Sequence, residues 1–237
     1  MRQLLPELRD PVDPLEVYGD LPPAEGSRPG VRLNMIASAD GATAVAGLSG
    51  GLGGRADRAL FATLRSLADV VLVAAGTVRA EGYGPAAVPI AVVTRTLRLD
   101  WERPFFTAQK ARPIVVTVAS APDAARRRAA ELADLVVAGD HDVDLRVALE
   151  ALAERGFRAV LCEGGPTLNA QLAAAGLVDE LCLTLSPRLV GGDAKRVLAG
   201  PTLPAPLGLR LASLCDQDGF VFLRYRYSDD QGSRKLG

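Results

Sequence analysis

The residues best suited to chemistry in this 237-residue sequence lie where apolar runs stop at glycine-rich turns. The run FRAVLC, residues 157–162, ends at Glu163-Gly164-Gly165, and Pro166 then opens a segment that predicts a helix. Paired glycines let the backbone approach a ligand closely, and the unpaired N–H groups of a first helical turn favour a phosphate. A tight turn that needs glycine for its geometry alone explains these residues equally well.

Two further stretches combine the end of an apolar run with glycine. Gly76-Thr77 follows residues 69–75, and Thr77 could either cap a short helix or offer its hydroxyl to a ligand. Asp40-Gly41 follows residues 31–37, a run that Asn34 interrupts. Taken alone, capping and a simple Asp-Gly turn are the favoured explanations. Two glycine-marked strand ends in one sheet, however, suit a ligand that carries several phosphates.

The composition argues against several other chemistries. The single histidine, His141, lies in the polar cluster GDHDVD, and no set of His and Cys residues has the spacing of zinc ligands. No GxSxG stretch accompanies this histidine, so a Ser-His-Asp triad is not expected, and we predict no metal site. A chain this poor in catalytic side chains either takes its chemistry from a cofactor or is not an enzyme.

Charge and cysteine usage limit the partners and the compartment. The 27 basic and 28 acidic side chains nearly cancel, which argues against broad binding to nucleic acid or to an anionic membrane. No run of 18 apolar residues could span a bilayer, and the first residues have no apolar signal core. The three cysteines are far apart and predict buried free thiols in a reducing cytoplasm: Cys162, Cys182 and Cys215.

Apolar runs and amphipathic segments alternate after residue 30. The predicted strands are residues 31–37, 69–75, 89–94, 112–118, 135–139, 157–162 and 179–187, and the predicted helices are about 55–67, 120–130, 143–155 and 166–175. A hairpin is predicted over 209–227. This order predicts one α/β domain whose mixed, mostly parallel sheet is flanked by helices and ends in a C-terminal antiparallel hairpin. Ligands bind such folds at the carboxyl ends of the strands, where the three turns lie.

The domain boundaries follow from composition. Residues 1–29 carry six prolines and predict an extended arm that is not packed. Residues 30–228 are predicted to form the folded domain, and residues 229–237 a flexible tail.

Together the motifs resemble the reductase domain of riboflavin biosynthesis, which has a dihydrofolate-reductase-like fold. The resemblance covers about residues 31 to 227, and the order and spacing of the motifs carry it: Asn34, Ser38-Ala39-Asp40-Gly41, Gly47-Leu48-Ser49, Leu64-Arg65, Ala68-Asp69, Ala75-Gly76-Thr77, Glu163-Gly164-Gly165-Pro166, Leu177-Val178-Asp179-Glu180 and Pro187 to Gly191. It implies an NADPH-dependent reductase that acts on a small heterocycle, usually as a homodimer. The partly apolar hairpin 209–227 fits a symmetric partner, although burial in the chain's own sheet is an alternative.

The resemblance also implies positions for the site. It places the cofactor against Ser38, Gly76, Thr77, Arg95, Glu163, Gly164, Gly165 and Leu168, with Arg95 at the 2′-phosphate. It places the substrate against Asn34, Asp40 and Ser49, and Arg55 or Arg58 could reach a ribose phosphate, although the solvent face of a helix start is the simpler position for both. Asp40 is the candidate catalytic residue, which would anchor a ring amino group and support its protonated form while a water delivers the proton.

Two departures from the family pattern bear on the substrate. Ala74 stands where family members usually have glycine, and the segment Gly50 to Gly54 lacks the usual aromatic and hydroxyl residues. The predicted function is reduction of a C=N bond, in 5-amino-6-(5-phosphoribosylamino)uracil, with no deaminase activity. The alternatives are a dihydrofolate or pterin reductase and a non-catalytic NADPH-binding protein of the same fold.

Overall fold

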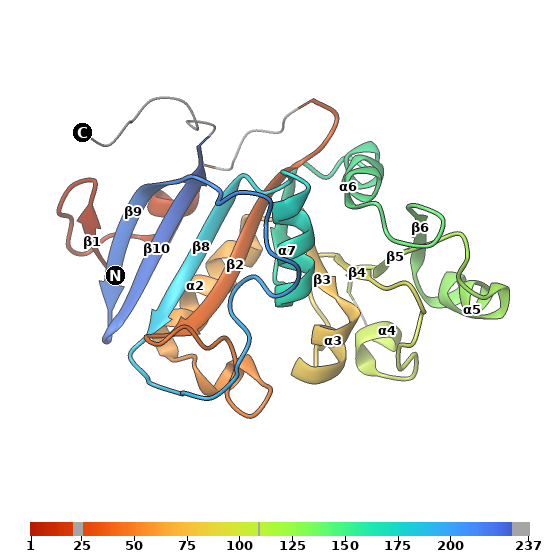
Figure 1. Cartoon of the computed structure of the whole chain (residues 1–237), viewed down its shortest axis with the longest axis horizontal. Helices are drawn as coiled ribbons and strands as arrows, with labels where there is room; N and C mark the ends of the chain where they lie inside the picture. Colours follow the sequence, from red (N-terminus) through yellow and green to blue (C-terminus); the bar gives the residue numbers. More distant parts are fainter. Residues whose placement is uncertain (21–25, 109, 229–237) are drawn as a thin grey trace.

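The computed structural model describes residues 1–20, 26–108 and 110–228. Its core is a ten-stranded sheet in the order β1-β9-β10-β8-β2-β7-β3-β4-β5-β6 (Figure 1). The strands are β1 (Arg2–Leu5), β2 (Gly30–Ser38), β3 (Val70–Ala74), β4 (Ile90–Val93), β5 (Ile114–Thr117), β6 (Asp134–Val137), β7 (Ala159–Cys162), β8 (Glu180–Ser186), β9 (Leu209–Gln217) and β10 (Phe220–Tyr227). Neighbours from β8 to β6 are parallel, whereas β8, β10, β9 and β1 pair antiparallel. The predicted mixed sheet with its C-terminal hairpin is thereby confirmed.

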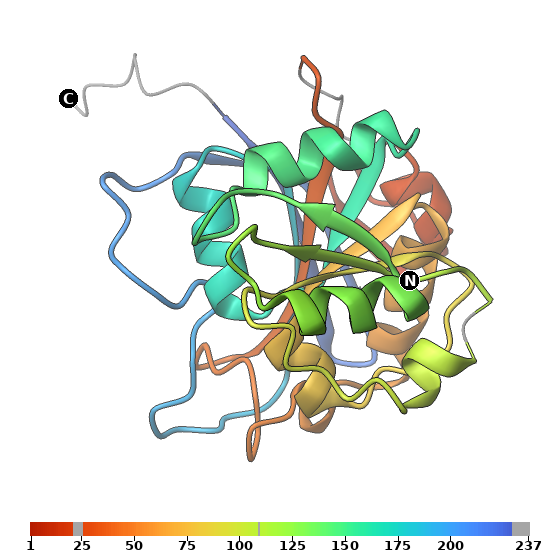
Figure 2. The same cartoon turned by 90° about the vertical axis from the view of Figure 1, so that its right-hand side faces the viewer.

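Helices cover the parallel part of the sheet on both faces (Figures 1 and 2). One apolar cluster joins α1 (Pro14–Tyr18), α2 (Arg55–Ser66), α3 (Ala75–Glu81), α4 (Pro104–Thr107) and α5 (Asp123–Leu132) to one face. A second cluster joins α6 (Leu145–Glu154) and α7 (Pro166–Ala174) to the other face. The central parallel strands are buried on both sides for this reason, which explains their unbroken apolar sequences.

The prediction of an extended, unpacked arm over residues 1–29 is wrong. Strand β1 pairs with β9, and α1 contributes buried side chains to the core, including Tyr18, which is 0% exposed. Proline does not always break regular structure. Pro14 occupies the first turn of α1, where its fixed φ suits a helix, and the Asp13 side chain accepts a hydrogen bond from Leu15 N. The predicted tail, residues 229–237, lies outside the described residues.

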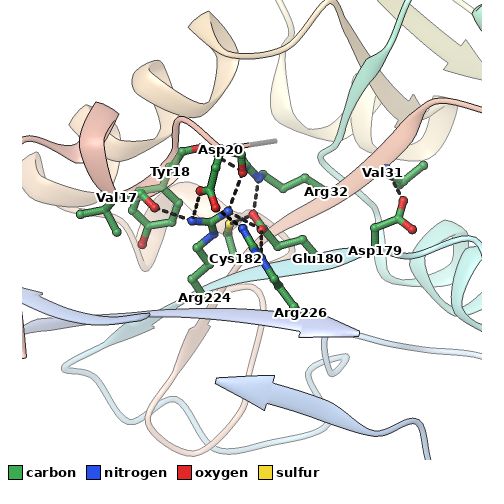
Figure 3. A network of polar contacts seen from close by, with 10 residues as sticks. All are labelled: Val17, Tyr18, Asp20, Val31, Arg32, Asp179, Glu180, Cys182, Arg224 and Arg226. Carbon is green, nitrogen blue, oxygen red and sulfur yellow. Dashed lines mark hydrogen bonds and ion pairs between the residues drawn. The ribbon is translucent and has the colours of Figure 1, made fainter. Parts of the chain in front are cut away.

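A buried group of charges ties α1 to three strands (Figure 3). The Glu180 carboxylate is fully buried and accepts hydrogen bonds from Arg32 Nε at 2.5 Å and Arg224 Nη2 at 2.6 Å. The Arg32 guanidinium also donates to the carbonyl of Tyr18 at 3.0 Å, and Arg224 donates to Asp20. We call these residues, with Arg226, the Glu180 network. It fixes the N-terminal segment against β2, β8 and β10.

Two further expectations concern the buried free cysteines and the absence of a membrane-spanning segment. All three cysteines are buried and unpaired, as predicted, and burial raises the pKa of the Cys162 thiol to about 12. Within residues 1–20, 26–108 and 110–228, none of the helices is long and apolar enough to cross a membrane.

Candidate active site

A cavity of about 940 Å³ opens at the carboxyl ends of β2, β3 and β7. Its walls come from the outer half of β2, the segment after it, one face of α2 from Asp57 to Arg65, and α3. The turn 163–166 and the loop 190–195 complete it. This volume lies in the range of natural sites for small molecules and cofactors. Its place at the strand ends is where open α/β sheets bind ligands.

The two glycine-marked turns meet in this cavity. Strands β3 and β7 are neighbours, and Ala74 N donates a hydrogen bond to Gly164 O at 2.7 Å. A Cβ atom on Gly165 would lie 2.8 Å from Thr77 Oγ1, too close for an unstrained contact. Gly164 has a φ of +82°, which disfavours any other residue. The sequence therefore keeps a side-chain-free surface between the two turns.

The carboxylate at the mouth of the turn is fully engaged by two side chains. Glu163 accepts hydrogen bonds from Arg65 Nε at 2.6 Å, Arg65 Nη2 at 2.7 Å and the Tyr83 hydroxyl at 2.5 Å. The Arg65 guanidinium also lies over the Phe61 ring, 4.5 Å from its centroid. Burial and the Glu163 charge raise the pKa of Tyr83 well above its usual value, so its hydroxyl stays a donor. The resemblance pointed to Arg65 only as part of a motif, and no sequence pattern indicated Tyr83.

Asp40 lies outside the cavity and holds a loop. Its carboxylate accepts from the Ser38 hydroxyl at 2.5 Å, from Gly191 N at 2.7 Å and from Val190 N at 3.1 Å. These donors, the Ser38 hydroxyl first, lower the pKa of Asp40 to about 2. Thr43 holds the same loop, because its backbone N and hydroxyl both donate to Lys195 O, at 3.1 and 2.8 Å. Asp40 therefore positions the loop that lines the substrate side, and its catalytic role stays a prediction.

The structure brings about half of the predicted site residues together. Those that line the cavity are Asn34, Ser49, Arg58, Gly76, Thr77, Glu163 and Gly165. Those that do not are Ser38, Asp40, Arg55, Arg95, Gly164 and Leu168.

Each residue outside the cavity has an evident structural position. Ser38 is buried against Asp40, and Gly164 supports the turn through its carbonyl. Leu168 faces the core between α7 and the sheet. Arg55 is exposed at the first position of α2. Arg95 forms an ion pair with Asp142 at 2.6 Å, in which both side chains are more than half exposed, at 63% and 81%.

The glycine-rich segment is held by a residue that sequence reasoning missed. Glu81, at the end of α3, accepts a hydrogen bond from Ser49 N at 2.7 Å. This contact fixes the short 3₁₀ turn Ser49–Gly51 beside the cavity. Gly50 and Gly53 line the space without side chains, which leaves room above the first turn of α2.

Asp57 is the second missed residue. It lies in the first turn of α2, lines the cavity, and is half-buried. The Thr184 hydroxyl on β8 hydrogen bonds to it, and among the described residues no arginine or lysine forms an ion pair with it. Burial raises the pKa of its carboxyl, against the opposing effects of Thr184 and the nearby Arg58. An acidic residue in a first helical turn usually serves the helix dipole, so the sequence alone did not single it out.

Comparisons with known proteins agree with this geometry. The sequence matches the family model of the RibD C-terminal domain over residues 29–221. It is 34% identical over 187 residues to the 2,5-diamino-6-ribosylamino-4(3H)-pyrimidinone 5′-phosphate reductase of Methanothermobacter thermautotrophicus. The matched region covers 73% of this chain and 85% of that protein.

Two solved structures share the fold. A pyrimidine reductase-like protein from Corynebacterium diphtheriae is 26% identical, with a TM-score of 0.76 over 92% of this chain and 99% of that one. The riboflavin biosynthesis reductase Rib7 of Saccharomyces cerevisiae is 21% identical, with a TM-score of 0.71 over 90% of this chain and 97% of that one. The expected dihydrofolate-reductase-like fold is confirmed.

Proposed function

Because this chain belongs to the RibD C-terminal domain family, whose curated members are pyrimidine reductases of riboflavin biosynthesis, we propose that it reduces a ribosylamino-pyrimidine 5′-phosphate with NADPH. The observation that carries the proposal is the contact between the Glu163-Gly164-Gly165 turn and Thr77 at the ends of two neighbouring strands. The substrate class follows the names of the curated relatives, and the choice between its diamino and uracil members is a separate question.

The residues present fit a dinucleotide. Gly165 is the N-cap of α7, and no side chain occupies the N–H groups of that helix start. The missing Cβ atoms of Gly76 and Gly165 leave the backbone of both turns accessible from the cavity. Backbone N–H groups at such a helix start favour phosphate oxygens. Glu163 is already neutralised by Arg65, so its charge does not oppose a bound anion.

The chain's own part in the reduction is to bind and orient. A bound nicotinamide supplies the hydride. The loop 190–195, held by Asp40 and Thr43, and the glycine-rich segment, held by Glu81, enclose the substrate side and limit access of water. Arg58 and Lys195 line this side and are the cations placed to meet a substrate phosphate.

The test is NADPH oxidation followed by absorbance, with the ribosylamino-pyrimidine phosphates and with dihydrofolate as separate substrates. We expect turnover of a pyrimidine phosphate. Turnover of dihydrofolate alone would replace the proposal with a pterin reductase, and NADPH binding without turnover of any of them would leave a binding protein.

A matched variant tests the cofactor position. Gly165→Ala places a Cβ 2.8 Å from Thr77 Oγ1, so the turn or the Thr77 side chain must shift where the phosphates are proposed to lie. We therefore expect the Kd for NADPH, measured by fluorescence titration, to rise by about tenfold or more. The double variant Thr77→Ala, Gly165→Ala removes the clash and should recover part of the loss, with Thr77→Ala alone as the control. An unchanged Kd in folded Gly165→Ala would contradict this cofactor position.

The proposal includes a homodimer in the cytoplasm. In Figure 1 no helix lies over the faces of β8, β10 and β9 that point away from α2. The half-buried side chains of this surface are paired across the strands: Leu181 with Tyr225, Leu183 with Leu223, and Leu185 with Val221. A second copy would cover this surface through a two-fold axis.

Light scattering at micromolar concentration should give the dimer mass, and Leu183→Glu with Leu223→Glu should give a monomer. A monomer mass for the unmodified chain would rule the dimer out.

A further inference from the structure

We propose that Asn169 is a positioning residue for the substrate side of the cavity. Its side-chain amide holds the carbonyl of Val197, and this contact fixes the loop 190–195 as a wall of the site. The inference rests on the reductase function proposed above, and it assigns a role to a residue that does not itself line the cavity.

Asn169 is a buried amide in a helix whose other buried side chains are apolar. It is 0% exposed, and the other buried residues of α7 are Leu168, Ala170, Leu172 and Ala173. Burying an amide costs free energy unless it is hydrogen-bonded. An apolar side chain would fill this position without that cost, so the contacts that the amide makes are the reason to look for its role.

Both ends of the amide have partners in other segments. Asn169 Nδ2 donates a hydrogen bond to Val197 O at 3.1 Å, and Asn169 Oδ1 accepts one from the Cys162 thiol, with 3.5 Å between oxygen and sulfur. Burial raises the pKa of the Cys162 thiol to about 12, so the thiol stays protonated and is the donor in this pair. The thiol therefore fixes the orientation of the amide, and the NH₂ group faces the Val197 carbonyl.

The segment 187–200 takes its position from hydrogen bonds more than from packing. It runs from the end of β8 to the side of α7 (Figure 1), and all of its residues are half-buried or exposed. Asp40 and Thr43 anchor it at one end, beside β2. A segment with few buried apolar contacts moves readily when such an anchor is lost.

Asn169 belongs to the second anchor, beside α7. Val197, whose carbonyl it holds, follows the cavity-lining loop 190–195 by two residues. Ala199 N donates to Pro166 O at 3.0 Å and completes this anchor. The loop is thus held on both sides, and loss of the Asn169 contact would release the side that adjoins α7.

The main variant is Asn169→Asp, which keeps the size of the side chain. Burial raises the pKa of the new carboxyl, and the titratable group that faces it, the Cys162 thiol, stays neutral. When protonated, the carboxyl donates to Val197 O as the amide does. When ionised, it has no proton to donate and places a negative oxygen against that carbonyl.

The expected readout is the KM for the ribosylamino-pyrimidine 5′-phosphate, divided by that of the unmodified enzyme at the same pH. In Asn169→Asp this ratio should be about ten at alkaline pH, the effect of one lost buried hydrogen bond, and should fall toward one as the pH falls. Asn169→Ala removes both contacts without adding a charge, so its ratio should be raised at every pH. It carries the test if Asn169→Asp does not fold.

A control variant and two binding-independent comparisons separate positioning from a general loss of structure. Gln171→Glu adds the same charge on the exposed face of α7 and should leave the KM unchanged. The Kd for NADPH, from fluorescence titration, should change less than about twofold in both Asn169 variants, because the hydrogen bond from Ala74 N still holds Gly164 O in the turn. Amide hydrogen exchange of the free protein should be faster at Ala199 in these variants and unchanged at Gly191, which Asp40 holds.

The outcomes are distinguishable from failure of the proposed function. An unchanged KM in the folded Asn169 variants would overturn the inference, and so would a loss confined to the Kd for NADPH, which would assign Asn169 to the cofactor turn. Failure of the unmodified chain to reduce any ribosylamino-pyrimidine phosphate would instead remove the proposed function, and the exchange rate of Ala199 would still show whether Asn169 anchors the segment.

Discussion

Two carboxylates beside the same strand, β8, have opposite surroundings. Glu180 begins the strand, is fully buried, and accepts from Arg32 and Arg224 in the Glu180 network (Figure 3). Asp57 contacts the same strand at Thr184, is half-buried, and among the described residues pairs with that hydroxyl and with no arginine or lysine. Burying a charge is costly unless it is paired, so the fold stabilises the first carboxylate and leaves the second short of donors. The difference separates a structural carboxylate from one that is available to a ligand.

Glu163 shows that a place in the cavity wall does not by itself make a carboxylate available. Its exposed fraction is 3%, and Arg65 and Tyr83 fill its hydrogen-bonding positions. Like Glu180, Glu163 is paired with an arginine. Like Asp57, it lies in the cavity wall. The number of hydrogen-bond donors around a carboxylate therefore indicates its availability to a ligand better than its distance from the cavity does.

The largest effect is expected from breaking the Glu180 network. Glu180→Gln removes the charge that balances Arg32 and Arg224, both of which are buried. Removing one partner of a buried ion pair costs about 3–5 kcal/mol because the remaining charge is uncompensated. Urea unfolding should show this loss as a lower midpoint. The control is Asp216→Asn, which breaks the exposed pair with Arg2 and should leave the midpoint close to that of the unmodified chain.

A smaller effect is expected when one donor is removed from Glu163. Tyr83→Phe keeps the ring and its edge contact with Phe105 but removes the 2.5 Å hydrogen bond. Leaving a buried acceptor without this donor costs about 1–3 kcal/mol, and Arg65 continues to balance the charge. Urea unfolding measures the loss. A midpoint equal to that of the unmodified chain would show that Glu163 does not depend on Tyr83.

Asp57→Asn should stabilise the folded chain, whereas the two substitutions above should destabilise it. Burial raises the pKa of this carboxyl above its unfolded value, so the folded chain holds the proton more tightly and loses stability as the pH rises through the folded pKa. The amide removes that cost at neutral pH. We expect the Tm at pH 7 to rise, by no more than the roughly 2–4 °C that 1 kcal/mol gives in a chain of this size.

The pH dependence identifies the cause of that gain. The difference in Tm should shrink as the pH falls and vanish below the unfolded pKa, where both side chains are neutral. If the gain in Tm stays constant with pH, its cause is packing and not the charge of Asp57. The contrast between the paired Glu180 and the unpaired Asp57 would then be weaker.

The sequence predicted the turns better than the side chains that act within them. Gly76, Thr77, Glu163 and Gly165 were found because glycine at the end of an apolar run has few uses, and the parallel order of the strands brings such ends to one edge. Strand patterns also predicted the sheet and its hairpin. These features follow from local periodicity and composition.

The remaining features depend on contacts that are distant in sequence. Asp40 was expected at the substrate, yet besides the nearby Ser38 hydroxyl it accepts from backbone N–H groups 150 and 151 residues away. Asp57 was missed because its contact with Thr184 joins α2 to β8. The folding of residues 1–20 depends on pairing with β9 and on the Glu180 network. No local pattern specifies such contacts.

The smallest effect is expected at Arg95, which was predicted at the cofactor's 2′-phosphate. The strand before it, β4, was located correctly, but the Arg95 side chain lies on the surface and pairs with Asp142 rather than lining the cavity. Exposed pairs of this kind contribute little because solvent screens both charges. Arg95→Ala should therefore change the Kd for NADPH less than about twofold in fluorescence titrations at low salt. A tenfold loss for NADPH, with NADH unaffected, would restore Arg95 to the site and would show that the surface pair with Asp142 opens when the cofactor binds.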